Sequence, residues 1–230
     1  MTISKKSVIA VLSAAVAVVA VTAAAATVIS ASRDVSGPTV VIDAGHGGAD
    51  GGMVGGTTGT RESDINLSIA KYLSGYFTSG GYNVVLTRSD GASVSGGLKY
   101  SKREDMNARK KIIDAASPDL VISVHCNSYP VSSVRGAQAF FASTDGETFA
   151  RSVQSYFNNV CNTKPRTAAV GDYYILKCSD YPSVLCECGF LSNPDEESLL
   201  ITASYQQKIA YTVYSAIDAV FGDSSQTQVQ

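Results

Sequence analysis

The sequence contains two histidines, and each directly follows an apolar run rich in β-branched residues. His46 comes after VVIDAG at 40–45, and His125 comes after LVISV at 120–124. Such runs are typical of buried strands. Because ligand sites in open α/β sheets lie beyond the carboxyl ends of the strands, we expect both imidazoles at one edge of a sheet. This shared placement favours a chemical role over two separate structural ones.

A carboxylate completes a metal-ligand set with these imidazoles. Glu62 follows a glycine-rich loop at 45–59 and stands where a helix is expected to begin. Two histidines and one glutamate form an established ligand set for catalytic zinc, with one position left for water. We therefore expect His46, Glu62 and His125 to bind Zn²⁺. On its own, Glu62 would also be explained by the favourable position of an acid at a helix start.

The glycine-rich loop at 45–59 also has a rival interpretation as a phosphate-binding loop. Neither the G-x-G-x-x-G spacing nor a glycine followed by lysine occurs in it. We therefore expect the glycines to let the backbone approach a metal or an extended ligand closely.

A second carboxylate lies within a strongly apolar run. Glu187 stands between Cys186 and Cys188 in the segment VLCECGF at 184–190. Burial without a partner raises the pKa of a carboxylate towards neutrality. Such a pKa suits a group that first accepts and then returns a proton. We expect Glu187 to be the general base and acid, while the metal acidifies water and polarises the scissile carbonyl.

Several polar residues near these motifs leave further possibilities open. Asp43 and Asn127 lie close in sequence to the histidines and could orient an imidazole ring. Glu187 could instead pair with a buried arginine such as Arg88 or Arg109. In that case it would be structural.

The hydrophobic patterns predict strands that alternate with helices. Such alternation indicates an α/β three-layer sandwich, with a mostly parallel sheet covered by helices on both faces. We expect a surface loop at 162–171, a turn or helix start at 193–195 and a disordered polar tail from 222. The expected strands are 38–43, 82–87, 119–125, 136–142, 173–177 and 183–189, and the expected helices are 63–80, 102–116, 146–161 and 205–221.

The N-terminus carries an export or anchoring signal. Lys5 and Lys6 precede an almost unbroken apolar segment at 8–29, which is about long enough to cross a membrane. We expect residues 1–33 to be an uncleaved anchor, with cleavage near 30–32 as the alternative. In both cases the catalytic domain at 34–222 lies outside the cytoplasmic membrane, and a tail follows at 223–230.

Composition excludes some partners and leaves the cysteines open. The net charge is −2, and removing Lys5, Lys6 and Arg33 makes it −5, which gives no sign of nucleic-acid binding. The five cysteines are an odd number, and a domain of this size needs no disulfides. We expect buried thiols, with Cys161 and Cys178 as the best pair if a disulfide exists.

Four motifs in order resemble the zinc-dependent N-acetylmuramoyl-L-alanine amidases of bacterial cell walls. They are VIDAGHGG at 41–48, ESDINL at 62–67, ISVHCNS at 122–128 and ECGFLSN at 187–193. The resemblance implies a mixed six-stranded sheet with helices on both faces. It also implies that His46, Glu62 and His125 hold zinc and that Glu187 is catalytic. The cysteines at 126, 186 and 188 depart from the family pattern.

The resemblance implies cleavage of the amide between the lactyl group of N-acetylmuramic acid and the L-alanine that opens the stem peptide of peptidoglycan. The segments YYILK at 173–177 and YPSVL at 181–185 look like the sporulation type, which acts on spore cortex. We also consider an accessory protein that loads zinc or opens the site as a partner.

Other protein classes fit the sequence less well. The alternative function is a catalytically inactive peptidoglycan-binding module of the same fold, although such modules should lose one of the four groups. A Cys/His peptidase is disfavoured because Cys126 and His125 are strand neighbours and face opposite sides. A serine hydrolase lacks its G-x-S-x-G motif.

Overall fold

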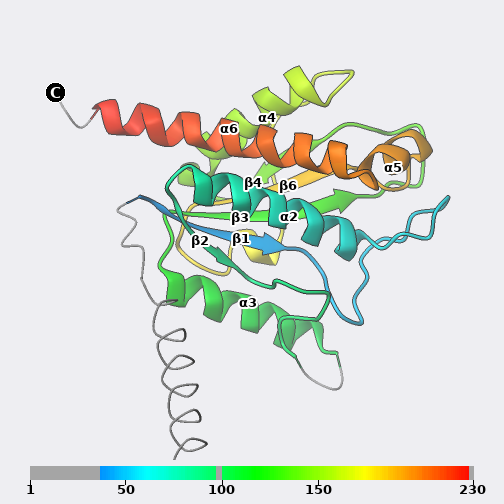
Figure 1. Cartoon of the computed structure of the whole chain (residues 1–230), viewed down its shortest axis with the longest axis horizontal. Coiled ribbons are helices and arrows are strands. Elements are labelled where there is room, and N and C mark those ends of the chain that lie inside the picture. Colours follow the sequence, from blue (N-terminus) through cyan, green and yellow to red (C-terminus); the bar gives the residue numbers. More distant parts are fainter. Residues whose placement is uncertain (1–36, 97–99, 228–230) are drawn as a thin grey trace, which may run out of the picture. The chain divides into compact units, whose positions relative to one another are not determined.

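The computed structural model describes residues 37–96 and 100–227, and its centre is a six-stranded sheet (Figure 1). The strand order is β2-β1-β3-β6-β4-β5. β2, β1, β3 and β6 are mutually parallel, whereas β4 pairs antiparallel to β6 and parallel to β5. The strands are β1 (Thr39–Ala44), β2 (Asn83–Leu86), β3 (Leu120–Asn127), β4 (Gln138–Phe141), β5 (Ala169–Val170) and β6 (Ser183–Phe190).

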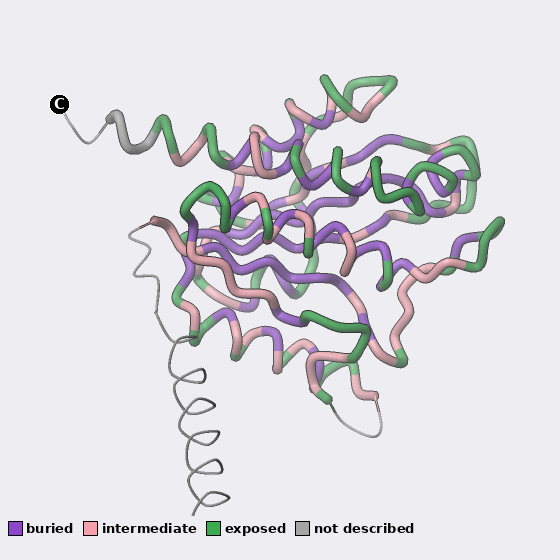
Figure 2. Tube along the Cα trace, viewed as in Figure 1, coloured by how far each residue is buried: buried purple, intermediate pink, exposed green. Residues whose placement is uncertain are grey.

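Helices cover both faces of this sheet. The strands at its centre are almost wholly buried, as Figure 2 shows. On one face lie α2, α4 and α6, and α3 lies on the other face (Figure 1). The prediction of a three-layer α/β sandwich is therefore confirmed. The helices are α2 (Glu62–Ser79), α3 (Lys102–Ala116), α4 (Thr144–Val160), α5 (Pro194–Leu200) and α6 (Ala203–Thr227), with a 3₁₀ turn, η1 (Tyr174–Leu176).

Strand alternation divides the core into two clusters. In β1, Val40 and Ile42 pack towards α2 and α6, and Val41 packs towards α3. Residues of β3 and β6 alternate in the same way: Ile122 and Val184 belong to the larger cluster. The intervening positions of all three strands therefore face α3, and these positions carry the polar side chains discussed below.

Three local predictions differ from the structure. The segment expected to be the fifth strand, 173–177, forms η1, and β5 is instead a two-residue strand at Ala169–Val170, inside the predicted surface loop. The tyrosine pair in 173–177 gave the segment a high strand propensity, but the segment forms a 3₁₀ turn that helps to line the site cavity. The last helix does not end near Phe221 but continues to Thr227, so most of the predicted disordered tail is helical.

The expected domain boundary at 34 precedes the first described residue, Gly37. The predicted anchor at 1–33 lies outside the described residues. None of the helices within the described ranges combines the length and the apolar character that a membrane span requires.

A buried ionic cluster fastens the carboxyl end of β1 to α3. The guanidinium of Arg109, with no exposed surface, donates to Asp43 at the end of β1 and to Asp105 one helical turn away. Its Nη1 also donates to the carbonyl of Ala44, and its Nη2 to that of His46 (2.7 Å). One side chain thereby connects the helix, the strand end and the loop that begins at His46.

We expect Arg109→Met to lower the free energy of unfolding by about 3–5 kcal/mol, because Asp43 and Asp105 would remain buried without their partner. Urea unfolding measures the change. Lys110→Met removes a neighbouring cation whose partner, Asp114, is exposed, and it should leave the stability almost unchanged. Equal losses in the two variants would contradict a special role for the buried cluster.

Candidate metal centre

Three adjacent parallel strands bring the predicted site residues to one edge of the sheet. β1, β3 and β6 are consecutive in the sheet and end in the same direction. His46 lies just beyond β1, while His125 and Glu187 lie opposite each other near the ends of β3 and β6. Because residues opposite each other in this register face the same side, both side chains point to the face covered by α3. Glu62 comes from the first turn of α2.

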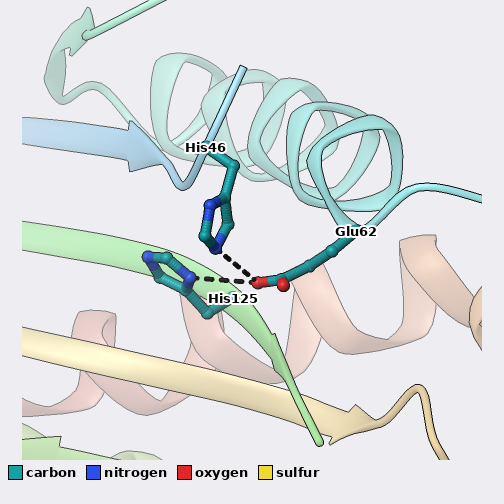
Figure 3. A group of neighbouring side chains, drawn as sticks. All are labelled: His46, Glu62 and His125. Atoms are coloured by element: carbon teal, nitrogen blue, oxygen red, sulfur yellow. Dashed lines mark hydrogen bonds and ion pairs between the residues drawn. The ribbon is translucent and has the colours of Figure 1, made fainter. Parts of the chain in front are cut away.

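The three predicted ligands converge. One atom from each of His46, Glu62 and His125 lies within 4.8 Å of the other two. Glu62 Oε1 is 3.3 Å from His46 Nε2 and 3.1 Å from His125 Nδ1. Figure 3 shows the two imidazoles directed at this carboxylate. Bonds of 2.0–2.2 Å to a tetrahedral ion place neighbouring ligand atoms roughly 3.3 Å apart. The donor set and its spacing fit a divalent metal ion such as zinc.

Glycines in the loop after β1 make this convergence possible. A Cβ on Gly45 would lie 2.3 Å from Cε1 of His125, and one on Gly52 would lie 2.4 Å from Glu62 Oε2. His46 itself has a φ of 61°, a left-handed conformation that is rare for a residue with a side chain. The prediction that the glycine loop permits close approach to the metal site is consistent with these contacts.

Glu62 is held in place by its surroundings. Its Oε2 accepts a hydrogen bond from the backbone N–H of Met53 (2.8 Å), and its Oε1 accepts from the backbone N–H of Cys126 (3.1 Å). Asn66, one turn later in α2, also donates to Oε1. Burial acts to raise the pKa of Glu62, but its hydrogen bonds to the two histidines hold that pKa well below the usual range. The carboxylate is therefore ionised and ready to bind a cation.

Asp50 orients His46, a role that sequence analysis did not assign to it. Asp50 Oδ2 is 2.9 Å from His46 Nδ1, which directs His46 Nε2 towards Glu62. The hydroxyl of Tyr100 donates to the same oxygen (2.8 Å), and the N–H of Gly52 donates to Asp50 Oδ1. The only available signal was the position of an acid four residues after a histidine, inside a loop whose conformation the sequence does not determine.

The residues expected to orient a histidine do something else. Asp43 accepts hydrogen bonds from Thr87 and Ser123 and pairs with Arg109, so it secures β1 rather than an imidazole ring. The side chain of Asn127 accepts from the following backbone N–H of Ser128. Among the described contacts, the side chains of both residues therefore bind groups other than an imidazole.

Glu187 lies in the same cavity as the three ligands. The cavity has a volume of about 500 Å³ and is lined by all four predicted site residues. Glu187 is 7% exposed, and its Oε2 has no hydrogen-bond partner within 37–96 and 100–227. Burial raises its pKa to about 7. The group is thus poised to exchange a proton near neutral pH.

Neither arginine proposed as a structural partner binds Glu187. Arg109 is committed to the β1 cluster, and Arg88 donates to the carbonyls of Ala44, Gly45 and Ser63. Arg88 therefore supports the same loop from the side of β2.

The five cysteines are free thiols, and four of them are buried as expected, whereas Cys161 is partly exposed. Cys161 and Cys178, the candidate pair, are not joined. Cys186 and Cys188 belong to the larger core cluster, on the opposite face of β6 from Glu187. Burial raises the pKa of Cys186, so the group stays a neutral thiol.

Comparison with known proteins connects this geometry to an activity. Residues 40–219 match the family model of N-acetylmuramoyl-L-alanine amidases, Amidase_3. The chain belongs to this family. The matched range contains all four predicted site residues and, apart from Thr39 at the start of β1, all six strands. The expectations of an amidase and of its fold are therefore confirmed.

Individual relatives extend the match. The germination-specific N-acetylmuramoyl-L-alanine amidase of Bacillus subtilis is 35% identical over 193 residues, which cover 81% of each protein. LytC of the same species, also an N-acetylmuramoyl-L-alanine amidase, is 31% identical and matches over 35% of its own length. The CwlD amidase of Clostridioides difficile, solved in complex with the GerS lipoprotein, is 35% identical with a TM-score of 0.75, covering 80% of this chain and 98% of that one.

We expect Asp50→Asn to weaken the amidase's affinity for Zn²⁺ by about 10–100-fold, since an imidazole without its carboxylate partner is less basic and less firmly oriented. Competition with a chromophoric chelator measures the affinity. Asp64→Asn removes an exposed acid from the same end of the sheet and serves as the control. An unchanged affinity in Asp50→Asn would refute the positioning role.

Metal binding to the amidase should also depend on pH. Partial burial acts to lower the pKa of His46, but hydrogen bonds and charges of Glu62 and Asp50 outweigh it and raise that pKa to about 9 in the metal-free protein. The bound proton therefore stabilises the metal-free fold fully below pH 6.5, and this contribution disappears as the pH rises through 9.

A metal ion must displace this proton from His46. We expect the apparent affinity for Zn²⁺ to rise about tenfold per pH unit between pH 7 and 9. Titration calorimetry in buffers of different ionisation enthalpy should detect the released proton. A flat affinity profile across this interval would contradict the prediction.

Proposed function

We propose that this amidase is zinc-dependent and cleaves the amide between the lactyl group of N-acetylmuramic acid and the L-alanine of the stem peptide. One observation supports the proposal above others: His46, Glu62 and His125 converge in a cavity that also contains a buried carboxylate, Glu187. The first three groups match a catalytic zinc set, and the fourth supplies the acid and base that amide hydrolysis requires.

A zinc ion bound by these three residues would acidify a water molecule and polarise the scissile carbonyl. Two of the ligands are prepared for this task by their neighbours: Asp50 orients His46, and Asn66 helps to fix Glu62. Such support keeps the ligand atoms in place before the metal arrives, which limits the reorganisation that binding requires.

Glu187 performs the proton transfer in this proposal. Its carboxylate accepts a proton from the attacking water and passes it to the nitrogen of the departing L-alanine. Its pKa of about 7 allows both steps near neutral pH, because the group loses and regains a proton with little free-energy cost. Its Oε2 has no hydrogen-bond partner in the described part of the chain, which leaves one oxygen available for this exchange.

We further propose that the substrate is peptidoglycan of the spore cortex and that the enzyme acts outside the cytoplasmic membrane. The names of the Bacillus subtilis germination-specific relative and the Clostridioides difficile CwlD relative support this assignment. The apolar segment 8–29 would export or anchor the chain. Because the CwlD structure contains a lipoprotein, an accessory protein is a reasonable partner to test for zinc loading.

Glu187→Gln should keep its zinc and lose activity by a factor of about 10²–10⁴, because the amide cannot accept the proton. His46→Ala should lose both zinc and activity. Metal analysis gives the zinc content, and mass spectrometry of muropeptides from treated spore cortex detects free stem peptide.

Glu104→Gln, an exposed substitution on α3, is the control and should behave like the wild type. Retained zinc-dependent activity in Glu187→Gln would refute the assigned role. A wild-type protein that releases no stem peptide from cortex or from vegetative wall would refute the proposed function and leave a binding module. Release from vegetative wall alone would refute the cortex assignment.

A further inference from the structure

A second cavity lies beyond β4, away from the candidate metal centre. It has a volume of about 560 Å³ and lies between the loop after β3 and the loop before β5. Three of its lining residues are cations, Arg135, Lys164 and Arg166, and none is acidic. The part of the chain after Arg33 has a net charge of −5, so such a concentration of positive charge is unusual for this protein.

Arg166 is held rigidly at this cavity. Its Nε and Nη2 donate to the carbonyl of Arg135 (3.1 and 2.6 Å), and its Nη1 donates to Oε1 of Gln138 (3.0 Å). Its guanidinium carbon also lies 5.1 Å from the centre of the Phe190 ring. These contacts use uncharged partners, so they fix the geometry of the guanidinium without neutralising it.

The positive charge of the cavity is only partly compensated. Asp195, exposed on α5, pairs with Arg135. Arg166 and Lys164 form no ion pair in the described ranges 37–96 and 100–227. Lys164 is exposed, so its ammonium is free to move towards a bound anion. A fixed guanidinium beside a mobile ammonium is an arrangement well suited to bind a carboxylate.

Strand pairing connects this cavity to β6, the strand that carries Glu187. Gln138 of β4 lies opposite Glu187 of β6 in the antiparallel register. Residues paired in this way face the same side of the sheet, so the side chain that holds Arg166 is the immediate neighbour of Glu187. A substrate whose scissile amide reaches Glu187 could therefore extend across β4 towards the cationic cavity.

We infer that this cavity binds a carboxylate of the stem peptide that is attached to the substrate. The inference rests on the proposed function, because the stem peptide is the leaving group of that reaction. It adds a second recognition point on the peptide side of the scissile amide. Arg166 supplies the fixed contact and Lys164 the adjustable one.

The test compares two synthetic muropeptides that differ only in the stem peptide, whose carboxylates are either free or amidated. For the full zinc-loaded chain, Arg166→Gln should raise the KM for the free-carboxylate substrate about tenfold, as expected for loss of a charged hydrogen bond. The kcat should stay within about twofold, because the reacting groups are not altered. For the amidated substrate, the wild type should already show the higher KM, and the variant should match it.

Two further variants test whether a rise in KM comes from the lost positive charge or from disturbed folding. Lys164→Glu reverses an exposed charge, so it should raise the same KM without affecting folding, whereas Lys71→Glu on the exposed side of α2 should not. Equal KM increases for both substrates, or no increase in Arg166→Gln and Lys164→Glu, would overturn the inference.

Binding of the free stem peptide provides an independent measurement. Calorimetry should show weaker binding, and therefore a higher Kd, for Arg166→Gln than for the wild type, even in metal-free protein. If the wild type hydrolysed neither muropeptide, the proposed function would fail, and this Kd comparison would still decide whether the carboxylate site exists.

Discussion

The candidate metal centre depends on one buried guanidinium. Arg109 connects the carboxylate of Asp43 at the end of β1, that of Asp105 on α3 and the carbonyl of His46. His46 has a left-handed backbone conformation, which costs free energy for a residue with a side chain. A hydrogen bond from a fixed charged donor to its carbonyl offsets part of that cost. Arg109 thus fixes the backbone from which Asp50 can then orient the imidazole.

The order of the strands turns this local constraint into a site. β1, β3 and β6 lie side by side, and each contributes one group at its carboxyl end or just beyond it. Their alternation sends His125 and Glu187 to the α3 face. Glu62 reaches the same point from α2 on the other face, where the missing side chain of Gly52 leaves room for its carboxylate. The centre therefore lies where the two layers meet at the sheet edge.

Much of this arrangement was predictable, because hydrophobic alternation locates long strands and helices well. The runs before His46 and His125 gave two central strands, and the apolar surroundings of Glu187 gave a third. Short elements were less predictable: the pattern at 173–177 favoured a strand, yet tertiary contacts turn it into η1. The role of Asp50 was also missed, because it depends on the path of a glycine loop, and glycines leave that path undetermined in sequence.

The sulfur atoms of β6 illustrate what strand alternation achieves chemically. Cys186 and Cys188 flank Glu187 in sequence, yet their thiols lie in the apolar core behind the sheet. Thiolates are strong ligands for zinc and for softer ions such as Cu⁺, so sulfur placed beside the imidazoles would add a further donor to the site. The alternation of side chains along β6 keeps both thiols on the opposite face from Glu187, although each is only one residue away from it. Exchanging Glu187 with either neighbour would therefore bring a thiol to the metal centre and place the carboxylate in the apolar core, where burial without a partner is costly.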